Sequence, residues 1–157
     1  MDEQSVGQDA VVSLRDVTKE TVSRICKLSD TLSADQHKMV APNAYSIAQA
    51  YFEKRAWFRA VCADDVPVGF VMLYDDAEKD HVYLWRFMIA GEHQGKGYGR
   101  RALGLVLDHA RTRPNAREIT ASYVPIEGGA GPFYRKLGFE PTGEMEGEEV
   151  VIRRPLR

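Results

Sequence analysis

The apolar residues of this chain fall into runs that polar turns separate, and the spacing within the runs differs. Runs rich in β-branched and aromatic residues predict strands, and they cover residues 11–15, 57–63, 66–74 and 81–89. Asp64 and Asp65 separate the second run from the third, and such a short polar turn favours a hairpin. An acidic turn over residues 75–80 leads into the fourth run. The last three runs therefore predict an antiparallel meander.

Other segments carry apolar residues at helical spacing. Val22, Ile25 and Cys26 form one such stripe. Residues 46–54 predict a helix whose apolar face consists of Ile47, Ala48, Tyr51 and Phe52. Residues 100–112 predict a longer helix, which the Pro114 segment ends. The polar segment 28–43 between the first two helices is interpreted as a loop with room for one helical turn.

The remaining elements follow in the C-terminal third. Residues 118–124 predict a strand, residues 127–135 a short helix that Gly138 ends, and residues 139–152 a hairpin turning near Gly147. This order of elements is typical of an α+β fold in which helices flank a mixed, mostly antiparallel sheet. A chain of 157 residues is long enough for one core. We therefore expect one domain over residues 10–157, preceded by a loose acidic tail over residues 1–9.

The amino-acid composition argues against several classes of binding partner. A formal charge of −2 gives no basic footprint for nucleic acid or an anionic membrane. No apolar run approaches the roughly 20 residues needed to cross a bilayer, and the polar N-terminus lacks the features of a signal peptide. Cys26 and Cys62 are interpreted as reduced core residues, and the histidines show no metal-ligand spacing. We expect a cytoplasmic protein with no metal.

The densest chemical signal is the segment 94–101, Gln-Gly-Lys-Gly-Tyr-Gly-Arg-Arg, between a predicted strand and a predicted helix. Alternating glycines let the backbone approach a ligand closely, and a helix N-terminus attracts phosphate. A P-loop would require Gly-Lys-Ser/Thr, but Tyr98, Gly99 and Arg100 follow Gly97. The dinucleotide fingerprint G-x-G-x-x-G would need its third glycine one residue later. The segment therefore predicts a different kind of phosphate or pyrophosphate site.

Two motifs carry a resemblance to a known family. The pattern Gln-x-x-Gly-x-Gly in the glycine loop resembles the pyrophosphate loop of the GCN5-related N-acetyltransferases. Residues 130–139, Ala-Gly-Pro-Phe-Tyr-Arg-Lys-Leu-Gly-Phe, resemble the second signature of the same superfamily. The two motifs lie within residues 81–139, and the similarity to the superfamily extends over residues 10–155. The resemblance implies a sheet with two splayed strands that hold acetyl-CoA, and transfer of its acetyl group to a primary amine.

The resemblance also implies roles for individual residues. Backbone groups of Phe87, Met88 and Ile89 would pair with the pantetheine arm, and one of their amides would polarise the thioester oxygen. The remaining residues expected to bind the cofactor are Gln94, Gly95, Lys96, Gly97, Tyr98, Gly99, Arg100, Phe133 and Tyr134. Arg101 is an alternative to Arg100 for a CoA phosphate. Tyr134 matches the tyrosine that protonates the departing thiolate, and a half-buried aromatic of purely structural function is its alternative.

The base that deprotonates the amine is left open among Glu127, His81 and Tyr123. Glu127 stands where the family usually has Asn, and we favour its other interpretation as a cap of the short helix that follows. His81 at a strand start is more typical of a surface residue.

The acceptor is indicated by the segment 40–51, which resembles the bacterial spermine/spermidine acetyltransferases. Tyr45, Trp85 and Arg86 are the candidate acceptor contacts. A cation at Arg86 opposes binding of a polyamine, and Arg86 could instead bind an acidic group. The alternatives to a polyamine are an amino-sugar antibiotic, an amino acid, a protein lysine or N-terminus, and a non-catalytic module that binds acyl-CoA. Dimers are common in the family, which leaves a homodimer open.

Overall fold

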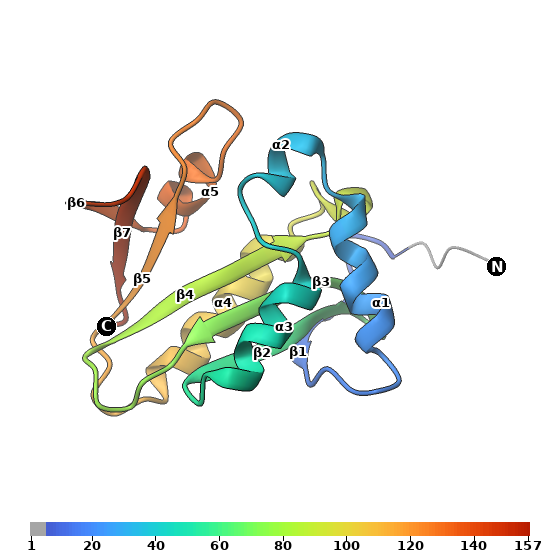
Figure 1. Ribbon diagram of the computed structural model, residues 1–157, viewed down its shortest axis with the longest axis horizontal. Coiled ribbons are helices and arrows are strands. Elements are labelled where there is room, and N and C mark those ends of the chain that lie inside the picture. The colour runs from blue at the N-terminus through green and yellow to red at the C-terminus, as the bar shows by residue number, and fades with distance from the viewer. Residues whose placement is uncertain (1–5) are drawn as a thin grey trace.

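A seven-stranded sheet with the strand order β1-β2-β3-β4-β5-β7-β6 forms the centre of the computed structural model, which describes residues 6–157 (Figure 1). The strands are β1 Val12–Arg15, β2 Ala56–Ala63, β3 Val66–Tyr74, β4 His81–Ile89, β5 Glu118–Tyr123, β6 Glu140–Glu146 and β7 Glu149–Pro155. Adjacent strands run antiparallel except for β4 and β5, which are parallel. This arrangement confirms the predicted α+β class and the mixed, mostly antiparallel sheet.

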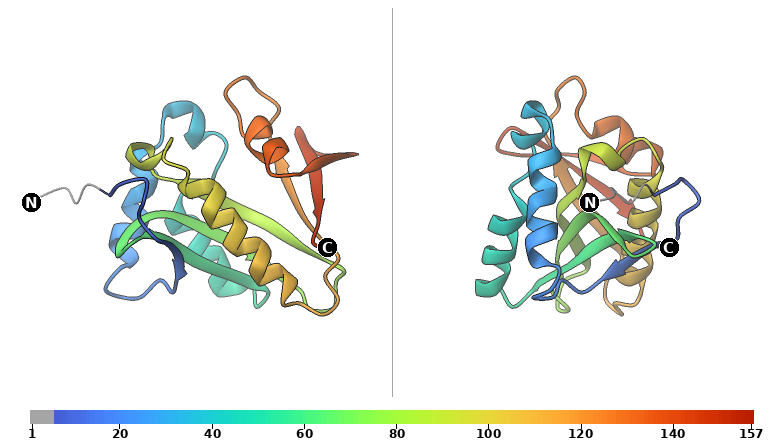
Figure 2. Two further views of the ribbon diagram at one scale, coloured as in Figure 1. Left: turned by 180° about the vertical axis from the view of Figure 1, so that it is seen from behind. Right: turned by 90° about the vertical axis from the view of Figure 1, so that its right-hand side faces the viewer.

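Helices cover both faces of the sheet (Figures 1 and 2). They are α1 Val22–Lys27, α2 Ala34–His37, α3 Asn43–Phe52, α4 Tyr98–Arg111 and α5 Gly131–Lys136, with the 3₁₀ turns η1 Leu28–Thr31 and η2 Gly91–His93. Helices α1 and α3 lie on one face, and α4 lies on the other (Figure 2). In α4 the buried residues Ala102, Leu103, Val106, Leu107 and Ala110 recur at helical spacing, so one apolar stripe of this helix meets the sheet.

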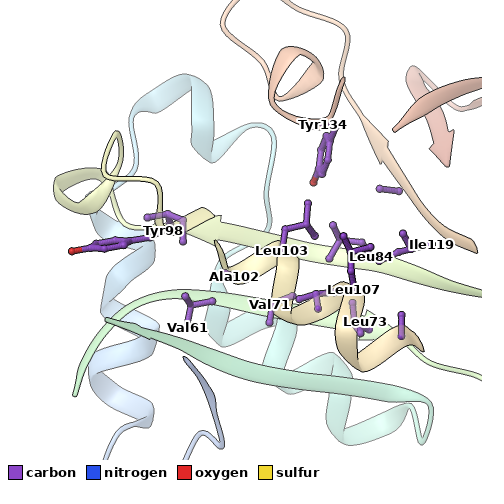
Figure 3. Packing of buried hydrophobic residues seen from close by; sticks show 14 of the residues in the cluster. Val61, Val71, Leu73, Leu84, Tyr98, Ala102, Leu103, Leu107, Ile119 and Tyr134 are labelled. Atoms are coloured by element: carbon purple, nitrogen blue, oxygen red, sulfur yellow. The ribbon is translucent and has the colours of Figure 1, made fainter. Parts of the chain in front are cut away.

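The sheet separates two hydrophobic cores. On the α4 face, the β-strand residues Val61, Val71 and Leu73 are fully buried with Leu103 in one cluster (Figure 3). On the other face, Phe70 and Met72 are buried with Ile25 of α1. Alternate residues of β3 therefore point into different cores, as the two-residue period of a strand requires. Both faces of this strand are covered, which explains why its sequence is a nearly continuous apolar run.

β4 and β5 diverge after a short stretch of pairing. Only the first residues of the two strands are in register, from His81 opposite Glu118 to Tyr83 opposite Thr120. Beyond that point β4 continues along β3, while β5 turns away with β7 on its other side (Figure 1). The family resemblance implied this splay, and within residues 6–157 it leaves the edge of residues 84–89 that faces β5 without a strand partner.

The segment 28–43, expected to be a loop with room for one helical turn, contains η1 and α2. A capping box at Ser33 and Gln36 begins α2. Helix α3 begins at Asn43, earlier than expected, because the buried Asn43 side chain donates to the Ile25 carbonyl at 2.9 Å. The prediction that Tyr51 and Phe52 belong to an apolar inner face is wrong: they are 85% and 84% exposed.

Residues 6–10 differ from the loose tail expected over residues 1–9, of which residues 1–5 lie outside the described part of the chain. Val6 and Ala10 are buried. The Tyr98 hydroxyl donates to the carbonyls of Gly7 at 2.6 Å and Val6 at 3.1 Å. We call residues 6–10 the N-terminal strap. It lies against the first turn of α4, because carbonyl groups of the strap accept hydrogen bonds from that turn and from the loop before it.

Candidate active site

A cavity of about 890 Å³ occupies the space between the diverging strands. β4 supplies residues 83–89 of its lining, and the end of β5 and the segment leading into α5 supply further residues between 122 and 134. Residues of the segment from Leu32 to Ala41 line another side, and the glycine loop lines the end near α4. Glu149, the first residue of β7, completes the lining. The two sequence motifs thus meet in one cavity, although they are separated in the chain.

The glycine loop presents bare backbone to this cavity. Gly95 and Gly97 have φ values of 78° and 83°, and a Cβ atom at either position would meet no protein atom within 4 Å. Gly97 is the N-cap of α4, and the first amide bonded back to it is that of Arg101, at 3.2 Å. The amides of residues 98–100 precede this bond and have no partner within the helix. Such a helix start has the geometry of an anion site.

The polar side chains of the loop separate into two groups. Lys96 Nζ donates to the Val6 carbonyl at 3.0 Å, and the Arg101 guanidinium donates to Ala10 at 2.7 Å and Gln8 at 2.8 Å. Lys96 and Arg101 thus bind the N-terminal strap and do not line the cavity, whereas Tyr98 binds the strap through its hydroxyl and is also part of the lining. Arg100 is exposed and lines the cavity. Of the two arginines left open for a CoA phosphate, Arg100 lines the cavity and Arg101 does not.

Gln94 anchors the loop to its surroundings. Its side-chain amide donates to the Ile89 carbonyl at 2.9 Å, at the end of β4. It also exchanges hydrogen bonds with Gln36 of α2, at 3.1 and 3.4 Å. The Gln94 side chain therefore connects β4, the glycine loop and α2 at one side of the cavity. This contact with α2 could not be read from the motif alone.

A bulge in β4 sets which side chains face the cavity. Met72 pairs with Arg86 and Leu73 pairs with Leu84, so Trp85 has no opposite residue in β3. The extra residue changes the alternation of side chains. Trp85 packs on the α1 side, while Phe87 stacks with Phe133 of α5 at a centroid distance of 6.1 Å. Phe87, Met88 and Ile89, which were expected to bind the cofactor, line the cavity together with Phe133.

Tyr134 projects from α5 into the region between the diverging strands (Figure 3). Its residue surface is 8% exposed, and its ring lies 5.3 Å from Phe139 and 5.4 Å from Phe133. Burial in this aromatic environment raises the pKa of the Tyr134 hydroxyl far above its usual range, and the negative charge of Glu149 acts in the same direction. The phenol therefore stays protonated throughout the physiological range.

The candidate bases lie in different places. Glu127 is exposed and does not line the cavity. Its interpretation as a helix cap is wrong, because α5 begins after Ala130 without any side-chain cap. His81 is bonded to Asp80 at 3.0 Å and also lies outside the lining. Tyr123 lines the cavity, and its ring packs so closely on Gly131 that a Cβ there would lie 2.9 Å from Tyr123 Cε2.

The candidate acceptor contacts also differ in whether they line the cavity. Trp85 and Arg86 line the cavity, whereas Tyr45 is 57% exposed and does not. Arg86 donates to Gln49 Oε1 at 3.1 Å and to the Trp85 carbonyl at 3.0 Å, and burial lowers its pKa. The acidic turn 75–80 does not contribute to the lining. Its Asp75 is instead bonded to His109 and Arg113.

Sequence reasoning missed several polar residues of the cavity, among them Tyr83, Ser122 and Glu149. Tyr83 and Ser122 line it and share a hydrogen bond of 2.9 Å between their hydroxyls, near the point where β4 and β5 part. Glu149 lines it from β7. The alternation of β4 could have identified Tyr83. No local signal marks Glu149, because its position depends on β7 pairing with β5.

Within residues 6–157, no three His, Cys, Asp or Glu side chains come together in a way that could hold a metal ion. None of the helices in that part of the chain is both long and apolar enough to span a membrane. Cys62 is buried, Cys26 is partly exposed, and both are free thiols.

Comparison with known proteins agrees with this geometry. The model of the Acetyltransferase (GNAT) family matches residues 26–139, which is most of the chain and includes both motifs. The chain belongs to this family. A spermine/spermidine N(1)-acetyltransferase of Bacillus subtilis (strain 168) is 32% identical over 94 residues, which are 55% of this chain and 62% of that protein. The match thus spans less than two thirds of the curated relative.

Solved structures confirm the fold. A putative acetyltransferase of the GNAT family from Desulfovibrio desulfuricans superimposes with a TM-score of 0.73 at 16% identity, over 94% of this chain and 100% of that one. A spermidine N-acetyltransferase from Vibrio cholerae, solved in complex with CoA and spermine, gives a TM-score of 0.70 at 18% identity, over 92% of this chain and 95% of that one. At these identities the similarity is one of fold.

Proposed function

We propose that this protein is an acetyl-CoA-dependent N-acetyltransferase that acetylates a primary amine. The observation that carries the proposal is one continuous cavity in a chain of the GNAT family. It reaches from the bare amides of the glycine loop, along the edge of β4 that β5 has left, to the buried phenol of Tyr134. A long thioester cofactor with a pyrophosphate at one end and a reactive carbonyl near the other matches this order of groups.

The residues present suit acetyl-CoA. The unpartnered amides of residues 98–100 and the bare Gly95 and Gly97 would hold the pyrophosphate, and Arg100 would add a charge-assisted hydrogen bond to a phosphate. The exposed backbone edge of residues 87–89 would pair with the amides of the pantetheine arm as a further strand does. Acetyl-CoA supplies the acyl group as an activated thioester. A β4 amide at this edge would stabilise negative charge on the thioester oxygen.

The transfer needs one bond to form and one to break. The amine nitrogen attacks the thioester carbonyl carbon, the C–S bond breaks, and the acetyl group stays on nitrogen as an amide. The departing sulfur carries the electron pair of the broken bond and takes a proton. Tyr134 is the proposed donor, because it lines this region and its raised pKa keeps its hydroxyl protonated and available to donate. A thiolate leaving in the same apolar environment is also more basic than in water, which favours the transfer.

A polyamine such as spermidine or spermine is the proposed acceptor. The Bacillus subtilis relative supports this assignment by name, and the Vibrio cholerae enzyme is solved with spermine. In this chain, Trp85 and Glu149 line the cavity, and an aromatic ring and a carboxylate both suit a cationic chain. Arg86 favours a second candidate, an acceptor amine that also carries an acidic group, because this arginine lines the same cavity.

A panel of acceptors tests the proposal. Purified protein is incubated with acetyl-CoA and with spermidine, spermine, a diamine, an aminoglycoside, glutamate or a lysine peptide, and acetylated products are measured by mass spectrometry. We expect acetylated spermidine or spermine. Acetylated glutamate in their place would support the second candidate. Binding of acetyl-CoA without acetylation of any amine would overturn the enzymatic proposal in favour of a module that only binds acyl-CoA.

A further inference from the structure

The charged residues that line the cavity are nearly all basic. Lys38, Arg86 and Arg100 contribute positive groups, and His37 and His93 are also part of the lining. Among the described residues of this lining, Glu149 is the single carboxylate. A cavity that must accept an ammonium group therefore contains one fixed negative side chain at which that group could bind.

Glu149 lies beside the far end of β5, beyond the residues of β5 that pair with β4. It directly precedes Val150, which is paired with Tyr123 at the end of β5. The charge of Glu149 affects the pKa values of three residues that line the cavity. Burial is the main cause of the raised pKa values of Tyr83 and Tyr134, and the charge of Glu149 raises both further. Burial lowers the pKa of Arg86, and Glu149 partly opposes this effect. The carboxylate is thus electrostatically coupled to the phenol assigned to the leaving sulfur.

The carboxylate of Glu149 is partly buried, and within residues 6–157 no ion pair or side-chain hydrogen bond involves it. Its neighbours on the β6–β7 hairpin differ. Glu146, its partner in register, and Glu148 are exposed and do not line the cavity. A cationic ligand would therefore give Glu149 the charged partner that the described part of the protein does not provide.

We propose that Glu149 binds the ammonium group of the acceptor and takes up the proton that this group must lose before it attacks. This inference rests on the proposed function. A primary ammonium with a pKa near 10.4 is neutral only on the order of 0.1% of the time at pH 7. In the proposed step, one N–H bond of the ammonium breaks, its electron pair becomes the nucleophile, and the proton moves to a Glu149 oxygen and later to water. After attack, nitrogen loses a second proton, which restores the Tyr134 phenol after Tyr134 has donated its own proton to sulfur.

The test compares Glu149→Gln with Glu148→Gln, a neighbouring exposed glutamate outside the lining. Steady-state rates are measured with the best amine of the acceptor panel, and KM for acetyl-CoA is measured in parallel. For Glu149→Gln we expect kcat/KM for the amine to fall about 10²- to 10³-fold, in the range of general base catalysis, while KM for acetyl-CoA stays within about twofold. Glu149→Asp should recover part of the loss. Equal activities of the two glutamine variants would overturn the proposal.

Calorimetry makes the test independent of turnover. Spermidine is titrated into the protein saturated with CoA, and thermal unfolding shows that each variant is folded. We expect Glu149→Gln to weaken spermidine binding at least about tenfold relative to Glu148→Gln. If the wild type binds spermidine but acetylates no amine, the proposed function and the proton-transfer role of Glu149 are both refuted. The ammonium-binding site of Glu149 is still supported in that case. If spermidine binds both glutamine variants equally, or does not bind the wild type, the ammonium site fails.

Discussion

The contact between Tyr98 and the N-terminal strap can be tested by removing a single atom. Tyr98 is 1% exposed, and its hydroxyl donates to the Gly7 carbonyl at 2.6 Å with a second contact to Val6 at 3.1 Å. Tyr98→Phe keeps the buried ring and removes the oxygen alone. Packing of the ring against the core is therefore preserved, and any change in stability reports on the strap contact.

The expected loss of stability in Tyr98→Phe depends on which carbonyl groups of the strap lose a hydrogen-bond donor. The Val6 carbonyl still accepts from Lys96 Nζ at 3.0 Å, whereas the shorter contact to Gly7 is lost. Loss of one hydrogen bond that leaves a part-buried acceptor behind costs about 1–2 kcal/mol. For a domain of this size, each kcal/mol shifts the melting temperature by about 2–4 °C, so we expect a decrease of about 2–8 °C.

Thermal unfolding of both the variant and a matched control provides the assay. Tyr51→Phe removes the same atom from a residue that is 85% exposed, and we expect its melting temperature to stay within about 1 °C of the wild type, as surface substitutions usually do. A Tyr98→Phe protein as stable as Tyr51→Phe would show that the strap contributes nothing to the anchoring of α4, and the reasoning would be refuted.

The other predictions concern a close backbone approach and a buried histidine. A Cβ at Gly69 would collide with the Met88 carbonyl oxygen and lie 2.8 Å from Ile89 Cδ1, whereas one at Gly104 would meet nothing within 4 Å. Chemical denaturation should therefore show that Gly69→Ala lowers the free energy of unfolding by about 1–3 kcal/mol or more. Gly104→Ala should leave it unchanged or raise it by up to about 1 kcal/mol. Equal effects of the two substitutions would contradict this prediction. Burial lowers the pKa of His93 below its unfolded value, so the unfolded chain binds more protons below about pH 6.5 and stability falls as the pH drops through this window. The slope of stability against pH should be smaller in His93→Gln, and an unchanged slope would contradict the assignment.

Much of the sheet was predictable because the sequence encodes it locally. The run 81–89 coincides with β4, and the two-residue Asp64-Asp65 turn joins β2 to β3 as expected. Short apolar runs bounded by turn residues carry enough information for these assignments. The glycine loop was equally accessible, since Gly95 and Gly97 adopt the positive φ angles that such residues tolerate.

The missed features all depend on contacts between distant segments. The cationic residues Lys96 and Arg101 suggested a ligand, yet their partners are strap carbonyls some ninety residues earlier in the chain. Helix α3 begins early because Asn43 finds a buried partner in α1. Glu149 reaches the cavity through the order β5-β7-β6. No local pattern reports such pairings, because the positions of the side chains are set by tertiary structure.

The most direct test of the account is the rate of acetyl transfer by Tyr134→Phe, with Tyr51→Phe as the matched control. The substitution leaves the ring in its aromatic environment and removes the one hydroxyl assigned to the leaving sulfur. With saturating acetyl-CoA and the best acceptor of the panel, we predict that kcat falls about 10²- to 10⁴-fold, while CoA affinity and melting temperature change little. A Tyr134→Phe protein that turns over as fast as Tyr51→Phe would contradict the account, because the buried phenol would then play no part in the transfer.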